Sequence, residues 1–357
     1  MKTHSEHRHH WYFYPGILLL VLALLFGGFV GWLTATEYRP EPIEAAATGG
    51  RQDRPQFQGE GLRVLTFNTG YASLGADSDF LMDGGKGPGQ VDEATLERNT
   101  EGIRQILEEA DADVYMLQEL DRGSHRTFGQ NQLELYGETL GDCGWSYAPN
   151  FLCNFVPFPP QKPFASIDSG VATYSPWHLE DEQRIALPGA FSWPMRIANL
   201  KRCMLMSRMP LGDRELVIIN FHLEAYDDGE GKAAQTAMVL DTVRREYEKG
   251  NYVIAGGDFN QLFPGVETDL KPTSQWVPGY LEPLPPDMEG WSLVCDPATP
   301  TCRLLNQPYD PESALTQYYV IDGFIVSPNL EVTALRTVDA GFLYSDHNPV
   351  LLEVSFR

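Results

Sequence analysis

Residues 251–260 read Asn251-Tyr-Val-Ile-Ala-Gly-Gly-Asp-Phe-Asn260, and this stretch decides the fold. The apolar run at its start predicts a short buried strand, and the two glycines permit a sharp turn at its end. If the chain stays extended beyond the turn, Asp258 and Asn260 point to one side and Phe259 points into the core. A carboxylate and an amide facing one cleft suit phosphate-ester chemistry. The alternative interpretation is a strand followed by an ordinary Asx turn.

Other predicted strands also end in polar side chains. The strands predicted at residues 63–67, 114–118 and 215–221 are followed by Asn68, Glu119 and His222, respectively. Each of these residues alone fits a turn or a structural histidine, but their repeated position at strand ends favours one shared site. Further strands are predicted at residues 170–174, 202–207 and 350–356, and amphipathic helices at residues 92–110 and 231–249 are expected to cover the sheets.

The C-terminal region contains a second acidic residue that needs a partner. Asp322 interrupts an apolar strand at residues 319–326, and an acid inside a strand is costly unless it is paired. The segment Ser345-Asp-His-Asn-Pro349 supplies a partner, because His347 could be oriented and charged by Asp322. Asp346 would then be free to bind a metal ion or to form hydrogen bonds.

Composition limits the function classes. The chain has 357 residues and a formal net charge of -23, and residues 61–357 suffice for one large domain. This charge disfavours tight non-specific binding of nucleic acid, although bound divalent cations would reverse the local sign at a phosphate site. The sequence lacks a Gly-x-Ser-x-Gly elbow, a Walker loop and a Cys-x-x-Cys zinc pattern, so it does not favour those chemistries.

An uncharged apolar stretch at residues 11–33 predicts a transmembrane anchor, because a spanning helix needs about 20 such residues. A cleaved signal peptide is the alternative, although its apolar region is usually only ~7–15 residues long. Lys2 and Arg8 precede the stretch and Arg39 follows it, which favours an extracytoplasmic domain. Residues 1–10 are interpreted as a short tail and residues 34–60, rich in Pro, Glu, Ala and Gly, as a flexible linker.

Three smaller features complete the predictions from local sequence. Residues 151–164 are aromatic and rich in proline, which predicts an ordered irregular loop. Cationic side chains that could meet a substrate phosphate are Arg122, His125 and Arg126. If the domain is extracytoplasmic, the candidate local disulfides are Cys143 with Cys153 and Cys295 with Cys302, whereas Cys203 is expected to be a buried thiol.

The polar motifs occur in a specific order: Thr66-Phe-Asn68, Gln118-Glu119, Asn220-Phe-His222, Gly257-Asp-Phe-Asn260, Ile321-Asp322 and Ser345-Asp-His347. This order resembles the endonuclease/exonuclease/phosphatase superfamily from about Leu62 to the C-terminus. The resemblance implies an α/β (α+β) fold, a four-layer α/β/β/α sandwich of two mostly antiparallel sheets, here preceded by one transmembrane helix. It implies catalytic roles for His222, Asp258, Asn260, Asp322 and His347. It also implies a metal-binding role for Asn68, Glu119 and Asp346, with Mg²⁺ or Mn²⁺ as the ion.

The expected function is therefore that of a membrane-anchored, metal-dependent phosphoesterase that hydrolyses its substrate by in-line attack of water. Either Asp258 or His347 could be the general base. The substrate is expected to be a phospholipid head group or nucleic acid, the lipid bilayer is the expected partner of residues 11–33, and no obligate protein partner is inferred. The alternative is a catalytically inactive family member that serves as a surface binding module.

Overall fold

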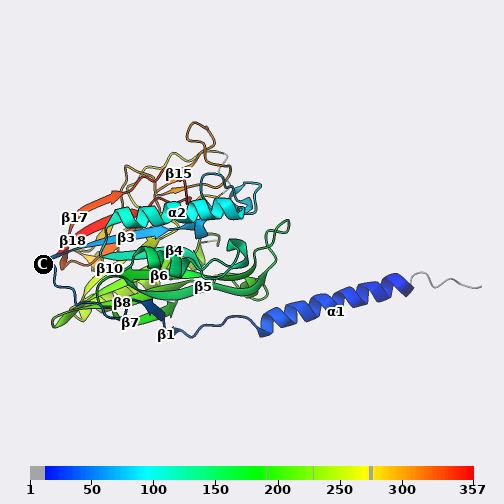
Figure 1. The fold of residues 1–357 in the computed structure, drawn as a ribbon, viewed down its shortest axis with the longest axis horizontal. Helices are drawn as coiled ribbons and strands as arrows, with labels where there is room; N and C mark the ends of the chain where they lie inside the picture. Colours follow the sequence, from blue (N-terminus) through cyan, green and yellow to red (C-terminus); the bar gives the residue numbers. More distant parts are fainter. Residues whose placement is uncertain (1–12, 190, 228, 273–275) are drawn as a thin grey trace, which may run out of the picture.

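Two seven-stranded sheets form the body of the protein (Figure 1). The computed structural model describes residues 13–189, 191–227, 229–272 and 276–357, so the predicted tail at residues 1–10 lies outside it. The first sheet has the spatial order β1 (Ile43–Ala45), β7 (Glu180–Ala186), β8 (Cys203–Leu211), β9 (Arg214–His222), β10 (Tyr252–Asp258), β16 (Asp322–Val326) and β13 (Ser292–Val294). The second has the order β17 (Leu330–Thr337), β18 (Val350–Phe356), β3 (Gly61–Asn68), β4 (Val114–Asp121), β6 (Ala165–Ser175), β5 (Gly144–Val156) and β2 (Ala47–Gly50).

Helices cover the outer faces of both sheets. Helices α2 (Glu93–Ala110) and α3 (Gln132–Thr139) pack on the second sheet, and α4 (Glu230–Glu248) packs on the first. Side chains alternate along each strand, so Leu65 of β3 faces α2 whereas Val64 faces the other sheet. A third apolar cluster fills the space between the sheets. The predicted four-layer sandwich is confirmed.

The predicted strands and helices are present with bounds that differ by a few residues, except for the strand predicted at residues 319–326. That segment forms two strands in different sheets, β15 (Tyr318–Tyr319) and β16. The loop predicted at residues 151–164 is wrong in its first part, because β5 continues to Val156. Phe151, Cys153 and Val156 are buried together against Phe164, so tertiary packing extends the strand beyond its proline. Helix α3 and strands β5, β7 and β17 were not predicted from the sequence.

Two parallel strand pairs position the polar residues. Strand β3 runs parallel to β4, and β9 runs parallel to β10, whereas the other pairs in the two large sheets are antiparallel. The carboxyl ends of all four strands therefore meet at one end of the sandwich. Beneath this end, Gln118 Nε2 donates to Asn220 Oδ1 at 2.8 Å, which joins the two sheets through a buried hydrogen bond. Asn220 Nδ2 donates in turn to the carbonyl of Ala172 at 2.8 Å.

The segment predicted as a flexible linker, residues 34–60, is ordered in part. Strand β1 pairs with β7 at the edge of the first sheet, and β2 pairs with β5 at the edge of the second. The prediction of flexibility at residues 43–50 is wrong, because backbone hydrogen bonds to two open sheet edges need no apolar side chains.

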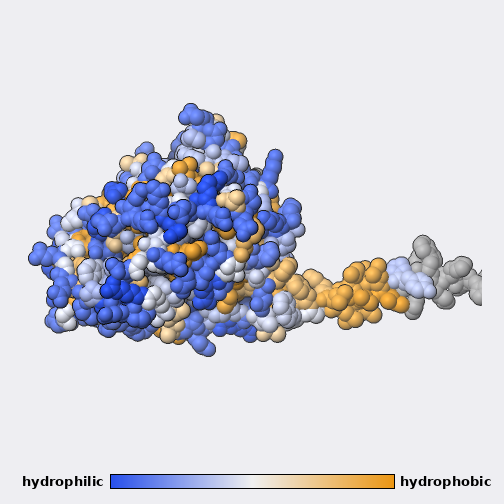
Figure 2. Space-filling model, viewed as in Figure 1, coloured by the Kyte–Doolittle hydropathy of each residue, from blue (hydrophilic) through white to orange (hydrophobic). Residues whose placement is uncertain are grey.

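An apolar helix near the N-terminus of the chain projects away from the sandwich (Figures 1 and 2). In helix α1 (Phe13–Ala35), the 22-residue stretch Tyr14–Ala35 is long and apolar enough to cross a membrane. At about 1.5 Å per residue this length matches a hydrocarbon core of ~30 Å. In Figure 1, β3 points toward the side of the domain from which α1 projects.

All five cysteines lie in the described residues and are free thiols. The candidate disulfide between Cys143 and Cys153 is wrong, because these residues lie near opposite ends of the extended strand β5, about 30 Å apart at ~3.3 Å per residue. A disulfide needs Cα atoms within about 7 Å. The candidate disulfide between Cys295 and Cys302 is also absent, since both residues are free thiols.

We expect Gly257→Ala to destabilise the fold by about 2–4 kcal/mol. Gly257 has a φ of 142°, and a Cβ atom there would lie 1.9 Å from the carbonyl oxygen of Phe221 in β9. The matched control is Gly212→Ala, since Gly212 also has a positive φ of 68° but has no atom within 4 Å of a Cβ position. Urea unfolding of both variants measures the difference, and equal losses would contradict the proposed clash.

Candidate active site

The predicted site residues come together at one cavity of about 430 Å³. Seven of them line it: Asn68, Glu119, His222, Asp258, Asn260, Asp346 and His347. The eighth, Asp322, lies behind His347 and contacts its imidazole. These residues come from both sheets and from the segment before β18, so the cavity lies where the strand ends of the two sheets meet.

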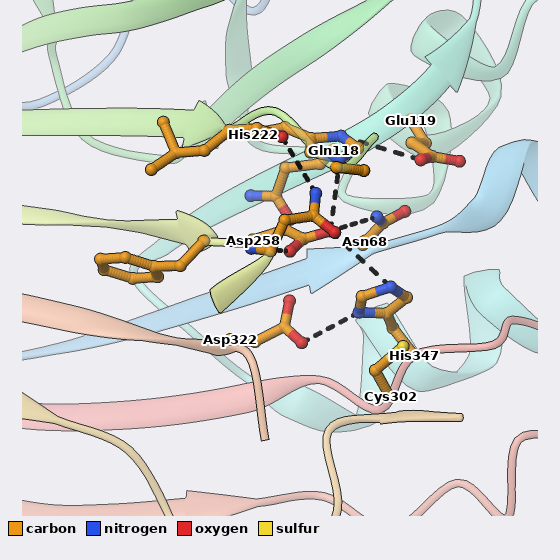
Figure 3. Close-up of polar contacts among 12 residues, drawn as sticks. Asn68, Gln118, Glu119, His222, Asp258, Cys302, Asp322 and His347 are labelled. Carbon is orange, nitrogen blue, oxygen red and sulfur yellow. Dashed lines mark hydrogen bonds and ion pairs between the residues drawn. The ribbon is translucent and has the colours of Figure 1, made fainter. Parts of the chain in front are cut away.

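Asp258 is the centre of the polar contacts (Figure 3). Its Oδ2 accepts a hydrogen bond from Asn68 Nδ2 at 3.0 Å and lies 3.3 Å from His222 Nε2 and 3.7 Å from His347 Nε2. Its Oδ1 accepts from the backbone N–H of Asn260 at 2.8 Å. The strand register explains this position, because Asp258 stands opposite His222 on β9 and opposite Asp322 on β16.

Asn260 reaches the cavity by a different backbone path from the predicted one. The chain is not extended there, since Asn260 has a φ of 50° in the left-handed region that asparagine tolerates. Its Nδ2 donates to the carbonyl of Leu223 at 2.9 Å. Phe259 is 1% exposed and packs in the core, as predicted.

The predicted contact between Asp322 and His347 is confirmed. His347 Nδ1 lies 2.9 Å from Asp322 Oδ2, and both residues are buried. Burial opposes a charge on His347, yet the carboxylate of Asp322 raises the pKa of this imidazole well above its ordinary value. The imidazole is therefore held as a cation with Nε2 directed toward Asp258.

Burial favours the uncharged form of the other two central groups, Asp258 and His222. Burial raises the pKa of Asp258 to about 7, and the Asp322 carboxylate adds to this effect. Burial lowers the pKa of His222 well below its ordinary value, and the nearby cations Arg202 and His347 act in the same direction. Asp258 can therefore exchange a proton near neutral pH, whereas His222 is neutral.

Oxygen atoms at the other side of the cavity could hold a metal ion. Glu119 lies at a β-bulge of β4 with a φ of 55°, a strained conformation for a non-glycine residue. Its Oε1 lies 3.7 Å from His222 Nδ1, and this buried nitrogen has no hydrogen-bond partner. Burial raises the pKa of Asp346 to about 7, and the Glu119 carboxylate adds to the shift.

These groups fit a hard divalent cation. Together with the amide oxygen of Asn68, the carboxylates of Glu119 and Asp346 form a set of oxygen donors, which is the chemistry that Mg²⁺ and Mn²⁺ prefer. Two ionised carboxylates in one cavity repel each other, and a divalent cation bound between them would offset this repulsion. Other groups with ligand atoms close together are Asp258, Asp322 and His347, and Cys302, Asp346 and His347.

Arg202 is a cavity residue that the sequence did not single out. It is 5% exposed, and its Nε and Nη1 atoms have no hydrogen-bond partner, although Glu224 Oε2 lies 3.6 Å from Nε. In the sequence it is only the first residue of the strand predicted at residues 202–207. Of the predicted phosphate contacts, only Arg126 lines the cavity, and its guanidinium is bound at 2.9 Å to both oxygens of Asp121.

Comparison with known families decides the identity of the fold. The model of the Endonuclease/Exonuclease/phosphatase family matches residues 65–347, which include all eight predicted site residues. The chain belongs to this family. Its members hydrolyse phosphoesters and are generally dependent on divalent metals. A search of curated proteins finds no match.

Solved structures share this fold. An endonuclease/exonuclease/phosphatase from Beutenbergia cavernae is 21% identical over 83% of this chain and 72% of its own, with a TM-score of 0.56. A family protein from Leptotrichia buccalis is 13% identical over 83% and 100% of the two chains, with a TM-score of 0.52. D. rerio TDP2 complexed with a single-strand DNA product is also 13% identical over 83% and 100%, with a TM-score of 0.51. At these identities the likeness establishes the fold alone.

Proposed function

We propose that the protein is a membrane-anchored, divalent-metal-dependent phosphoesterase that hydrolyses its substrate by in-line attack of water. The observation that carries this proposal is the position of Asp258 between two histidines of opposite charge preference, beside the oxygen donors of Glu119 and Asp346. Helix α1 anchors the enzyme, and the domain is extracytoplasmic. The substrate is a phosphate ester, either a phospholipid or nucleic acid.

In this mechanism Asp258 is the general base. Its Oδ2 is held by Asn68, and its raised pKa lets it accept a proton from the attacking water near neutral pH. His347 is kept protonated by Asp322, so it stabilises negative charge on the phosphoryl oxygens and does not compete for the proton. The structure therefore favours Asp258 over His347, a choice that the sequence leaves open.

The remaining cavity residues stabilise the transition state. Asn68, Glu119 and Asp346 would hold Mg²⁺ or Mn²⁺, which supplies a Lewis acid that polarises a phosphoryl oxygen and neutralises the leaving group. His222 and Asn260 are placed to donate hydrogen bonds to the phosphoryl oxygens. The unpartnered guanidinium nitrogens of Arg202 can bind an oxygen of the same phosphate.

Hydrolysis of bis-p-nitrophenyl phosphate by the full chain in detergent tests the proposal. We expect turnover with Mg²⁺ or Mn²⁺ and none after addition of EDTA. The absence of turnover with any divalent metal would contradict the proposal and favour the inactive binding module.

We expect the metal-free protein to lose stability as the pH rises from 6.5 to 8. Asp258 and Asp346 have pKa values of about 7 when folded, above their ordinary value of 3.8, so the folded state retains protons that the unfolded state has released. His347, with its raised pKa, acts in the same direction above pH 6.5. The lowered pKa of His222 acts in the opposite direction, but only below about pH 6.5, where the unfolded histidine is protonated.

Urea unfolding in EDTA at the two pH values measures this loss. Mg²⁺ should restore more stability at pH 8 than at pH 6.5, because the ion binds the ionised carboxylates. The Asp346→Asn substitution should make the free energy of unfolding in EDTA depend less on pH, because it removes one of the groups with a raised pKa. A free energy of unfolding that rises between pH 6.5 and 8 in EDTA would contradict the proposed ionisation.

A further inference from the structure

One wall of the catalytic cavity is apolar. This apolar wall consists of Phe80, Phe151, Phe158, Phe164, Met195 and Leu200. Phe80 packs against Phe158 and Phe164 with ring centroids 6.4 Å and 6.3 Å away. A purely ionic substrate such as a free sugar phosphate gains nothing from such a wall, whereas the apolar part of an amphiphile is stabilised by it.

The cations that line the cavity do not form a track for a polyanion. Three arginines line it in the described residues: Arg126, Arg202 and Arg303. Arg126 is bound to Asp121, and Arg303 donates to backbone carbonyls, including that of Gly75 at 2.7 Å. Arg202 retains two unpartnered nitrogens, Nε and Nη1, and Arg303 retains one, Nε. These few free donors are enough for one phosphate group. Channels that bind single-stranded nucleic acid combine aromatic side chains with a continuous row of cations. These lining residues include no such row of cations.

The apolar wall is joined directly to the membrane helix. Met195 and Ala198 lie on the short helix η4 (Met195–Ala198), and η4 contacts α1. The side chain of Glu37, just after α1, is only 1% exposed and lies 3.1 Å from Arg196 and 3.3 Å from Lys201. This ion cluster fixes the rim of the cavity at the end of the membrane helix.

Two further contacts strengthen this junction. Trp193 Nε1 donates to Thr34 Oγ1 at 3.3 Å, and the ring of Phe29 in α1 packs edge-on against Phe155 of β5 at 5.7 Å. Trp193 and Met195 nevertheless leave 54% and 64% of their surface exposed. Exposed Trp and Met side chains beside the end of a spanning helix are placed at the depth of the lipid head groups. Figure 2 shows the apolar surface of α1 running up to the domain.

We propose that the substrate is a phospholipid of the leaflet at which α1 ends, with its acyl part against the apolar wall and its phosphate beside Asp258 and Arg202. This inference rests on the proposed function. Water forms a bond to phosphorus, and the bond between phosphorus and the glycerol oxygen breaks. The proton of the water passes through the base to that oxygen, which gives an uncharged diacylglycerol and a phosphorylated head group. The uncharged diacylglycerol fits the apolar wall, and the charged phosphorylated head group is released to water.

The test compares lipid hydrolysis with hydrolysis of a soluble diester by the full chain. The protein is reconstituted in vesicles of phosphatidylcholine and phosphatidylglycerol with Mg²⁺, and released diacylglycerol is measured. Bis-p-nitrophenyl phosphate and single-stranded DNA are assayed in parallel. We expect diacylglycerol to form, and Met195→Asp to lower the ratio of lipid to soluble-diester turnover about tenfold, because a charge opposes the acyl chain. Met195→Leu is the matched control and should keep the ratio within about twofold.

The outcomes separate the two proposals. Turnover of the soluble diester without lipid hydrolysis would overturn the lipid substrate and leave the phosphoesterase proposal intact, as would efficient cleavage of DNA with no release of diacylglycerol. If Met195→Asp leaves the ratio of lipid turnover to soluble-diester turnover unchanged, the role of the apolar wall is overturned. Failure to hydrolyse any of the three substrates would contradict the phosphoesterase proposal itself.

Discussion

Asp258→Asn is expected to lower phosphodiester turnover by about 10³-fold while the fold stays intact, since general-base catalysis contributes about 10²–10⁴-fold. Asparagine has nearly the same shape and can still accept the hydrogen bond from the backbone of Asn260, although its NH₂ group replaces the oxygen that accepts from Asn68. It cannot accept a proton from water. We expect His222→Ala and His347→Ala to abolish turnover as well, because they remove hydrogen-bond donors to the phosphoryl group.

Asp213→Asn is the control for this series, because Asp213 is exposed in the turn between β8 and β9 and does not line the cavity. Steady-state hydrolysis of bis-p-nitrophenyl phosphate measures the effect, and circular dichroism checks the fold. Turnover close to that of the parent protein in a folded Asp258→Asn, His222→Ala or His347→Ala variant would contradict the assigned role of that residue.

Glu119→Gln is expected to weaken the apparent affinity for Mg²⁺ by about 100-fold or more, because it removes a charged ligand oxygen and keeps the shape of the side chain. The loss of activity should therefore be large at low Mg²⁺ and partly restored at high Mg²⁺. The Mg²⁺ dependence of turnover measures this shift.

The control is Glu134→Gln, since Glu134 is exposed on α3 and lies outside the cavity. An Mg²⁺ dependence of Glu119→Gln that matches the parent protein would show that Glu119 does not bind the ion. A loss of turnover that no concentration of Mg²⁺ restores would assign Glu119 a role in the chemical step instead.

Much of the site was predictable because strands deliver side chains in a regular way. Asn68, His222 and Asp258 each occupy the last position of a strand, and apolar runs mark those strands in the sequence. The pairing of Asp322 with His347 followed from the cost of an unpaired buried acid. Local chemistry therefore located these residues before their three-dimensional positions were known.

The remaining features depend on contacts between distant segments. Arg202 becomes a cavity residue only because β8 lies beside β9, and no local pattern separates it from an ordinary surface cation. The pairing of residues 43–50 depends on two sheet edges that are formed by later parts of the chain. Asn260 was expected in an extended backbone, but the hydrogen bonds to Asp258 and Leu223 accompany a left-handed conformation.

The pairing of β1 and β2 with the sheet edges has a practical consequence for producing a soluble form of this protein. A truncation that starts at residue 61 would leave β7 and β5 with bare backbone donors and acceptors, and exposed strands of this kind recruit neighbouring molecules into aggregates. A truncation that starts directly after α1, near Glu37, retains both protecting strands and the carboxylate that holds Arg196 and Lys201. The useful boundary for expression is therefore the end of the helix, not the start of the first long strand.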